Sequence, residues 1–287
     1  MPDASSKSWP RRLQRIGMLV VAIYATWLIA ACSMQQMLMY PGAGVAMVSY
    51  TDPPIPVGWE QWWLQPQPGV RVEAWFAPGC GRSAESPGPA VLVGHGNYEI
   101  IDFGDYFAEQ FAERGVSCVL VEFRGFGRST GSPSQEAITA DFVAYYDRLI
   151  ARPEVDASKV VLYGRSLGAA AVVQVAARRP SVALLLDSPF SSASAMAARM
   201  LAPPQLLRDH WRSDLVLAKY ASPILIMHGR NDPTIPISHA RELKRIAPHA
   251  TLVEHDGGHT DLAGRNFILY WKSIDETLRA AGVSAKR

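Results

Sequence analysis

The chain has 287 residues, a formal net charge of +2 and 48% hydrophobic residues. These values are typical of one large folded domain with a sizeable core, and the whole positive excess lies before residue 32, where the net charge is +3. Because the remainder is nearly neutral and has no basic run interleaved with aromatic residues, a protein that binds nucleic acid through a broad basic surface is excluded.

Residues 1–31 have the features of an export signal peptide. A segment with three arginines precedes the uncharged apolar stretch Ile16–Ala31, which is short for a spanning helix and ordinary for a signal peptide. The stretch ends in Ala30-Ala31-Cys32, which resembles the lipobox of bacterial lipoproteins. We predict that residues 1–31 are removed and that lipidated Cys32 anchors the exported protein in the cell envelope, facing the periplasm or the exterior. The alternative is an uncleaved signal anchor in which Cys32 has no role.

The rest of the chain is predicted to hold a linker and one catalytic domain. Residues 32–56 are expected to form the linker, extended from Met34 to Asp52, and residues 57–287 the domain. Alternating or short apolar runs predict strands near residues 59–63, 70–76, 90–93, 116–123, 160–163, 182–186, 224–229 and 251–255. Helical patterns cover residues 105–114, 134–152, 169–177, 238–246 and 266–281. Strands that alternate with helices predict an α/β fold with a mostly parallel sheet covered on both faces.

The most informative motif is Gly164-Arg165-Ser166-Leu167-Gly168, which lies between a predicted strand and a predicted helix. Gly-x-Ser-x-Gly on a strand-to-helix turn is the signature of the nucleophile elbow of serine hydrolases. Small residues flank the serine because the turn is sharp, and the new helix points its N-terminus at the reaction centre. Ser166 is therefore the predicted nucleophile, and the main-chain N–H of Leu167 is one predicted oxyanion donor.

A candidate acid and a candidate base follow the nucleophile in chain order. Asp232 and His259 each come after a later predicted strand, and the order Ser, Asp, His is that of α/β-hydrolases. The histidine would take the serine proton, and the aspartate would fix the imidazole tautomer. Asp187 is the alternative acid, while Asp261 is interpreted as a residue that begins a helix.

Several motifs in the right order resemble the α/β-hydrolase superfamily, and above all its membrane-anchored subgroup. The matching segments are Gly94-His95-Gly96-Asn97, Arg124-Gly125-Phe126-Gly127-Arg128-Ser129, the elbow, and His228-Gly229-Arg230-Asn231-Asp232-Pro233-Thr234-Ile235-Pro236. The resemblance covers roughly residues 36–280 and implies the α/β-hydrolase fold. It also implies that the second oxyanion donor is the N–H of Asn97, with that of Tyr98 as the alternative.

The same resemblance implies a small cap at about residues 188–222. Six apolar residues of this segment would line an acyl pocket as a lid, or would simply pack over the sheet: Met196, Met200, Leu201, Leu206, Leu207 and Trp211.

The other histidines and the cysteines carry no predicted chemistry beyond lipidation. Two histidines are expected to brace turns, one to be structural and three to lie at the surface: His95 and His228; His255; His210, His239 and His249. Three cysteines do not make a disulfide framework, and no cluster has metal-ligand spacing, so no metal or cofactor is expected.

These features predict a serine hydrolase that cleaves acyl esters or thioesters through a covalent acyl-enzyme. Its expected partners are an acyl substrate, either a small molecule or a lipid, and a membrane that it reaches through Cys32; no nucleic acid is expected. A serine peptidase of the same fold is one alternative. A catalytically silent, lipid-anchored binding protein is the other.

Overall fold

The computed structural model describes residues 8–44, 55–198 and 203–283. Its strands are β1 (Glu60–Gln67), β2 (Val70–Ala77), β3 (Gly88–Gly94), β4 (Ser117–Val121), β5 (Val155–Arg165), β6 (Ala183–Asp187), β7 (Ile224–Gly229) and β8 (Thr251–His255). Its α-helices are α1 (Ser8–Met39), α2 (Asp105–Glu113), α3 (Gln135–Ile150), α4 (Leu167–Ala176), α5 (Ala193–Ala198), α6 (Ser213–Leu217), α7 (Ser238–Ile246), α8 (Leu262–Arg265) and α9 (Phe267–Ala280). Two 3₁₀ turns are η1 (Ile101–Phe103) and η2 (Pro204–Leu206).

The strands form one sheet in the order β1-β2-β4-β3-β5-β6-β7-β8. The strands from β4 to β8 in this order run parallel, whereas β1 and β2 add an antiparallel edge. The predicted α/β fold with a mostly parallel sheet is confirmed, and the first strand begins one residue after Trp59.

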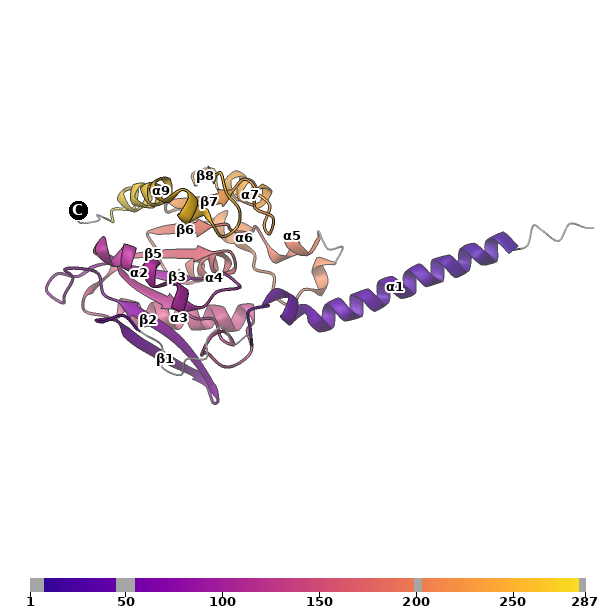
Figure 1. Ribbon diagram of the computed structural model, residues 1–287, viewed down its shortest axis with the longest axis horizontal. Coiled ribbons are helices and arrows are strands. Elements are labelled where there is room, and N and C mark those ends of the chain that lie inside the picture. Colours follow the sequence, from indigo (N-terminus) through magenta and orange to yellow (C-terminus); the bar gives the residue numbers. More distant parts are fainter. Residues whose placement is uncertain (1–7, 45–54, 199–202, 284–287) are drawn as a thin grey trace, which may run out of the picture.

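Helices cover both faces of this sheet (Figure 1). The side chains of α3, α4, α6 and α7 belong to one hydrophobic core, and those of α2 and α9 belong to the other. Neighbouring residues of a strand divide between the two cores: Leu92 faces the first and Val93 the second. This alternation, with both faces apolar, is the pattern of a sheet buried on both sides.

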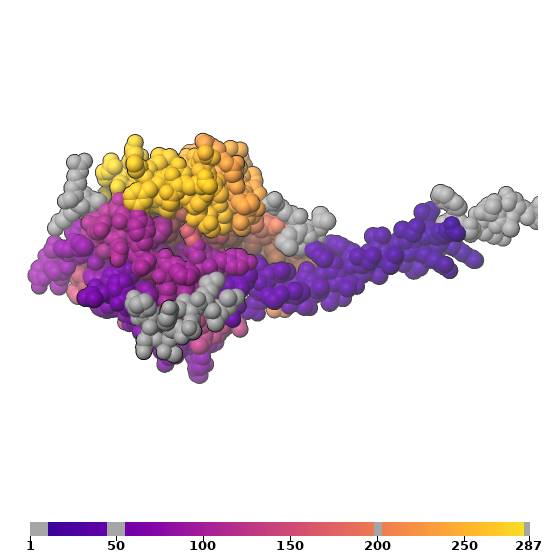
Figure 2. All heavy atoms as spheres, in the orientation of Figure 1, coloured from indigo at the N-terminus to yellow at the C-terminus, as the bar shows by residue number. Residues whose placement is uncertain are grey.

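Helix α1 projects from the domain as a single rod (Figures 1 and 2). Residues Arg11–Met39 are long and apolar enough to cross a membrane, and their most apolar stretch of 18 residues has a mean hydropathy of 2.1; a signal sequence shares these features. The structure differs from the predicted linker, because residues 34–39 are helical rather than extended. Side chains of this last part reach the domain: Gln35 Nε2 donates to the Leu206 carbonyl (2.6 Å) and Gln36 Nε2 to that of Pro133 (3.0 Å). Residues 45–54 of the predicted linker lie outside the described residues.

The segment between β6 and β7, which is predicted to form a small cap, contains α5, η2 and α6. Trp211 is fully buried and belongs to the hydrophobic core, and Leu207 packs against that core. Leu206, by contrast, is exposed. The packing alternative therefore describes Trp211 and Leu207 better than a lid does. Met200 and Leu201 lie outside the described residues.

Candidate active site

Ser166 lies on a sharp turn between β5 and α4. Its φ of +54° and ψ of −114° are unusual for a non-glycine residue, as expected for a nucleophile elbow. A Cβ atom at Gly164 would overlap the main chain of Gly168, and one at Gly168 would overlap the carbonyl of Gly94. The two glycines of the motif are therefore required by close main-chain approach, which lets α4 start directly above β5.

The structure brings the three predicted triad residues together. His259 Nε2 lies 3.1 Å from Ser166 Oγ, and His259 Nδ1 lies 2.7 Å from Asp232 Oδ2. The Asp232 side chain is fully buried, while that of His259 is 15% exposed. This chain of contacts has the geometry needed for the histidine to take the serine proton while the aspartate holds the ring.

Asp232 is held in place by its own loop. Its Oδ1 atom accepts hydrogen bonds of 2.8 Å from the N–H groups of Thr234 and Ile235. His228 Nε2 lies 3.3 Å from Asp232 Oδ2 and also contacts the Ile235 carbonyl at 2.7 Å. Burial acts to raise the pKa of Asp232, but the hydrogen bonds of His228, His259 and the main chain outweigh it and lower the pKa. The carboxylate is therefore ionised at neutral pH.

Asp187, the alternative acid, has other partners. Its Oδ2 atom accepts hydrogen bonds from the hydroxyls of Tyr270 (2.8 Å) and Tyr163 (3.4 Å), both deeply buried. Burial first, and then the charge of Asp187, raises the pKa of Tyr270 well above its ordinary value, so this hydroxyl keeps its proton and donates. The main-chain carbonyl of Asp187 accepts from the N–H of Ser166 at 2.9 Å. Asp187 thus supports the elbow through its main-chain carbonyl, whereas Nδ1 of His259 contacts Asp232.

The loop that carries His259 is also braced. Asp261 is the N-cap residue of α8, and its Oδ1 atom accepts a hydrogen bond of 2.7 Å from the N–H of Gly258. A Cβ atom at Gly229 would overlap the carbonyls of Gly257 and Gly258. The end of β7 therefore packs directly on the loop after β8, which brings the Asp232 and His259 loops together.

The two predicted oxyanion donors come from adjacent strand ends. Leu167 is the first residue of α4, so its N–H has no acceptor within the helix. Gly94, at the end of β3, pairs with Gly164 at the end of β5, which places the turn that contains Asn97 beside the elbow. Tyr98, the alternative donor, has a side chain 67% exposed to solvent. We call residues His95–Asn97 the oxyanion turn.

Charged residues hold the oxyanion turn. The Glu99 carboxylate accepts a hydrogen bond of 2.9 Å from the N–H of Gly96 and forms an ion pair with Arg165, the residue before the nucleophile. His95 Nε2 lies 2.6 Å from Oε1 of the fully buried Glu122. His95 thus braces a turn, as predicted. Glu99 and Glu122 are not predicted from the sequence, because no local pattern marks a carboxylate whose partners lie elsewhere in the chain.

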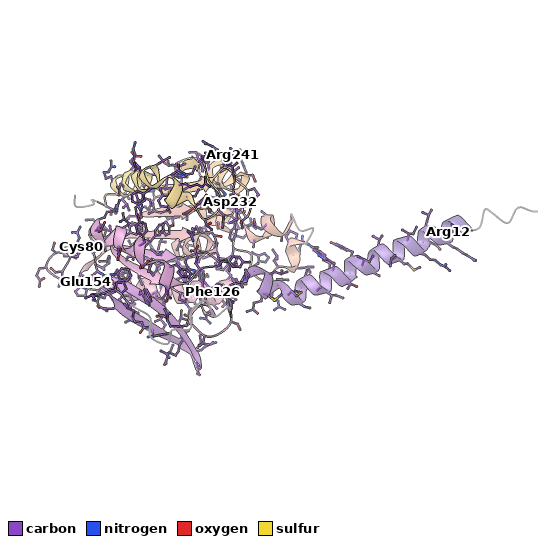
Figure 3. The ribbon with its side chains drawn as sticks, in the orientation of Figure 1. Arg12, Cys80, Phe126, Glu154, Asp232 and Arg241 are labelled. Carbon is purple, nitrogen blue, oxygen red and sulfur yellow. The ribbon has the colours of Figure 1, made fainter. Side chains whose placement is uncertain are left out.

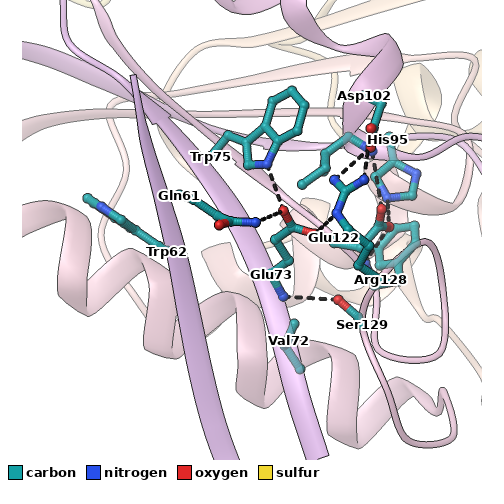
Figure 4. Close-up of polar contacts among 12 residues, drawn as sticks. Gln61, Trp62, Val72, Glu73, Trp75, His95, Asp102, Glu122, Arg128 and Ser129 are labelled. Atoms are coloured by element: carbon teal, nitrogen blue, oxygen red, sulfur yellow. Dashed lines mark hydrogen bonds and ion pairs between the residues drawn. The ribbon is translucent and has the colours of Figure 1, made fainter. Parts of the chain in front are cut away.

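A second buried network adjoins this one (Figure 4). Glu73, fully buried on β2, accepts hydrogen bonds from the Gln61 and Trp75 side chains at 2.7 and 2.8 Å. Its other oxygen accepts from Arg128 Nε at 2.7 Å, and the two terminal nitrogens of Arg128 bind both oxygens of Asp102 at 2.9 Å. The network therefore ties the antiparallel edge to η1, which follows the oxyanion turn.

An apolar cavity of about 200 Å³ opens beside the oxyanion turn. Most of its wall consists of apolar side chains from β3, β4, β5, η1 and α2: Val93, Ile101, Phe103, Phe107, Leu120 and Tyr163. His95, Glu99 and Arg165 supply its polar side. Arg165 directly precedes the predicted nucleophile in the chain, and the cavity has the character of a site for an apolar group.

One predicted surface residue is buried. His239 is 7% exposed, and its Nδ1 atom lies 3.0 Å from Ser191 Oγ, so the expectation that it lies at the surface is wrong. It is buried because α7 turns this face onto the cap segment. Among the described residues, no group of three or more His, Cys, Asp or Glu side chains is arranged to hold a metal ion.

Comparisons with known proteins agree with this architecture. A family model described as "Serine aminopeptidase, S33" matches residues 85–212. An uncharacterized protein of Mycobacterium tuberculosis is 31% identical over 249 residues, which cover 84% of this chain and 86% of that protein. The alpha/beta hydrolase domain-containing protein WAV2 of Arabidopsis thaliana is 30% identical over 242 residues, 75% of this chain and 77% of WAV2. Thermogutta terrifontis esterase 2 superposes with a TM-score of 0.66 at 18% identity, over 83% of this chain and 100% of that one.

Proposed function

Because this chain belongs to the α/β-hydrolase superfamily, we propose that it is a serine hydrolase that cleaves acyl esters or thioesters through a covalent acyl-enzyme. The observation that carries the proposal is the contact chain from Ser166 through His259 to Asp232, with distances of 3.1 and 2.7 Å.

Acylation begins when Ser166 Oγ attacks the carbonyl carbon of the substrate and His259 Nε2 takes the serine proton. The carbonyl oxygen becomes an oxyanion, which accepts hydrogen bonds from the N–H groups of Leu167 and Asn97. Asp232 stabilises the imidazolium and keeps Nδ1 protonated. When the intermediate collapses, the alcohol or thiol leaves with the proton from His259, and the acyl group stays on Ser166.

Deacylation repeats these steps with water. His259 takes a proton from the water molecule as its oxygen attacks the acyl carbon, and the same two N–H groups hold the second oxyanion. Collapse releases the carboxylic acid, and the proton returns from His259 to Ser166 Oγ.

The cavity beside the oxyanion turn supports an apolar acyl group as the bound part, and its volume of about 200 Å³ favours a short chain.

Peptidase activity is the second candidate, because the matching family model is described as a serine aminopeptidase. An aminopeptidase needs an acidic group that receives the free amino terminus of its substrate. Glu99 is the acidic residue among the described residues that line the cavity, and its carboxylate already binds Arg165 and the N–H of Gly96. This pairing favours an ester or thioester over a peptide with a free amino terminus.

We also propose that the enzyme works at a membrane in the cell envelope, held by lipidated Cys32 or, alternatively, by an uncleaved α1. Cys32 precedes Gln35 by one turn of helix or less, about 4.5 Å of rise, and Gln35 already bonds to the domain. Either anchor therefore places the domain directly against the membrane surface.

Two assays test the function. We expect a fluorophosphonate to label the wild-type protein and not Ser166→Ala, with the circular dichroism spectrum unchanged. A panel of p-nitrophenyl esters of rising chain length, run beside aminoacyl-nitroanilides, should show ester turnover with a preference for short chains. Label retained by Ser166→Ala contradicts the assignment of the nucleophile. Faster nitroanilide than ester turnover favours the peptidase.

A further inference from the structure

The end of α1 and the turn after it contact the oxyanion turn directly. Asn97 Nδ2 donates a hydrogen bond of 2.7 Å to the main-chain carbonyl of Met39, the last residue of α1. Gly42 lies so close to the Asn97 carbonyl and the Phe126 ring that a Cβ atom at position 42 would overlap both. Figure 3 places Phe126 on the side of the domain that α1 joins. Both the side chain and the main chain of Asn97 therefore touch residues 39–44, which we call the anchor segment.

This anchor segment, residues 39–44, is docked firmly. Tyr40 is 1% exposed, and its hydroxyl donates a hydrogen bond of 2.6 Å to Asp209 and accepts one of 3.2 Å from Trp211 Nε1. The N–H of Gly44 donates to the Gly125 carbonyl at 2.9 Å. Since the segment is fixed in the core on both sides of Gly42, its position determines how close the Asn97 main chain can lie.

We propose that the anchor segment is a positioning element of the active site, which holds the N–H of Asn97 where the oxyanion forms. The inference rests on the proposed function, because the position of this N–H matters only if an oxyanion forms beside it. An oxyanion donor must lie within about 2.7–3.1 Å of the charged oxygen. A shift of about 1 Å in a positioned group lowers the rate by up to roughly a hundredfold.

The segment that carries the proposed membrane anchor therefore contacts the oxyanion turn directly. Strain on α1 at the membrane would reach Asn97 through Met39 and Gly42, without passing through the cap. The same contacts exist whether the anchor is lipidated Cys32 or an uncleaved α1, because both begin before residue 39.

Two variants of the full-length protein, measured in detergent micelles, test the inference. Asn97→Ala keeps the main-chain N–H but removes the bond to Met39, and Gly42→Ala pushes against the Asn97 carbonyl. For both we expect kcat to fall about tenfold to a hundredfold while KM changes less than about threefold. Fluorophosphonate labelling of Ser166 should slow in proportion. If the contacts were merely structural, both variants would have a lower melting temperature, and their kcat and KM would stay close to the wild-type values.

Each variant has a matched control. A Cβ at Gly58, which lies outside the anchor segment, meets nothing within 4 Å although its φ is +87°, so Gly58→Ala tests backbone strain alone. Gln35→Ala removes the bonds of α1 to Leu206 and Arg208 in the cap and leaves the oxyanion turn alone. Both controls should keep the wild-type kcat.

The outcomes separate the two proposals. The positioning role alone is overturned if the wild type is labelled and active and the kcat of Asn97→Ala lies within about twofold of the wild-type value. This holds even if Gly42→Ala fails to fold. Wild type that takes no label at Ser166 and hydrolyses no ester overturns the proposed function, and the positioning role with it. A selective fall in kcat for Asn97→Ala, absent in Gln35→Ala, supports the inference.

Discussion

The neighbours of Ser166 and Asp232 hold each residue in a state that is unfavourable for it alone: a positive φ for Ser166 and a buried charge for Asp232. The positive φ of Ser166 costs of the order of 1–3 kcal/mol, and the flanking glycines and the bond from its N–H to Asp187 keep it there. The burial of Asp232 disfavours its charge, and hydrogen bonds more than offset that cost. In both cases the surrounding residues impose the state that the proposed chemistry requires.

At this scale, the role of Asp232 can be separated from that of Asp187. We expect Asp232→Asn to lower kcat by about 10⁴-fold with little change in KM, because the amide favours the wrong tautomer of His259. Asp187→Asn should lower the melting temperature more than the rate, since Asp187 binds Tyr270 and Tyr163. Steady-state kinetics and thermal unfolding of both purified variants check this. A collapsed kcat for Asp187→Asn beside a normal one for Asp232→Asn would reverse the two roles.

His255 should make the protein sensitive to acid. It is 1% exposed, and neither ring nitrogen has a hydrogen-bond partner among the described residues. Burial lowers its pKa below the ordinary value of about 6.5. The unfolded chain therefore binds a proton more readily, and stability that is present above pH 6.5 is lost as the pH falls toward the folded pKa.

His255→Phe tests that expectation, because an aromatic ring fills the space beside Tyr270 without titrating. Urea unfolding at pH 7.5 and 5.5 should show that the wild type loses more free energy of unfolding than the variant, by up to about 1.4 kcal/mol per pH unit. Equal losses in the two proteins would exclude His255 as the cause.

At the scale of elements, the site is assembled where strand ends meet. The ends of β3 and β5 are paired, and α4 begins so close to β3 that Gly168 contacts the carbonyls of Gly94 and His95. This packing sets the oxyanion turn against the N-terminus of α4, where unpaired N–H groups and the helix dipole favour negative charge. Close packing of elements, more than any one side chain, thus makes the proposed oxyanion site.

Gly168→Ala tests that packing. Its Cβ would overlap main-chain carbonyls, which cannot move as a flexible side chain would, so we expect a loss of about 1–3 kcal/mol in the free energy of unfolding together with a large fall in kcat. Gly264→Ala, in α8, is the control, because its Cβ meets nothing within 4 Å. Urea unfolding and ester turnover give the two readouts. Unchanged stability in Gly168→Ala would mean that the elbow tolerates a wider approach of α4.

At the scale of the whole molecule, α1 is an apolar rod outside a folded domain (Figure 2). None of its most apolar window is buried, and large hydrophobic side chains point outward around it. A helix stretch that is apolar on all sides requires an apolar environment, which the proposed membrane anchor would supply. The buried contacts of Tyr40 join the end of α1 to the domain.

Cys32→Ser tests the form of the anchor. If Cys32 is lipidated, the variant should lose both the lipid and the cleavage before residue 32, and it should migrate as the longer precursor. Mass spectrometry of the N-terminus of protein purified from its native host makes the comparison. An unmodified Met1 terminus on the wild type would exclude the lipoprotein and favour the uncleaved signal anchor.

The sequence by itself determined what depends on local pattern. The strands and helices followed from apolar periodicity, and the turn between β5 and α4 from the small residues around Ser166, while the leader stays a prediction from its charge and apolar run. Each of these features is set by neighbours within a few residues. Periodicity therefore predicted the α/β fold, and motif order predicted which three side chains lie together.

Only the tertiary structure decided what depends on distant contacts. Asp187 ends β6 and Asp232 follows β7, and both strands are apolar runs of similar sequence. Only the packing shows that tyrosines bind Asp187 and that His259 contacts Asp232. The docking of Met39 on Asn97 and the carboxylates that brace the oxyanion turn join residues that lie well apart in the chain. No local pattern encodes such pairs, because their free energy arises from burial and charge compensation that exist only once the chain has folded.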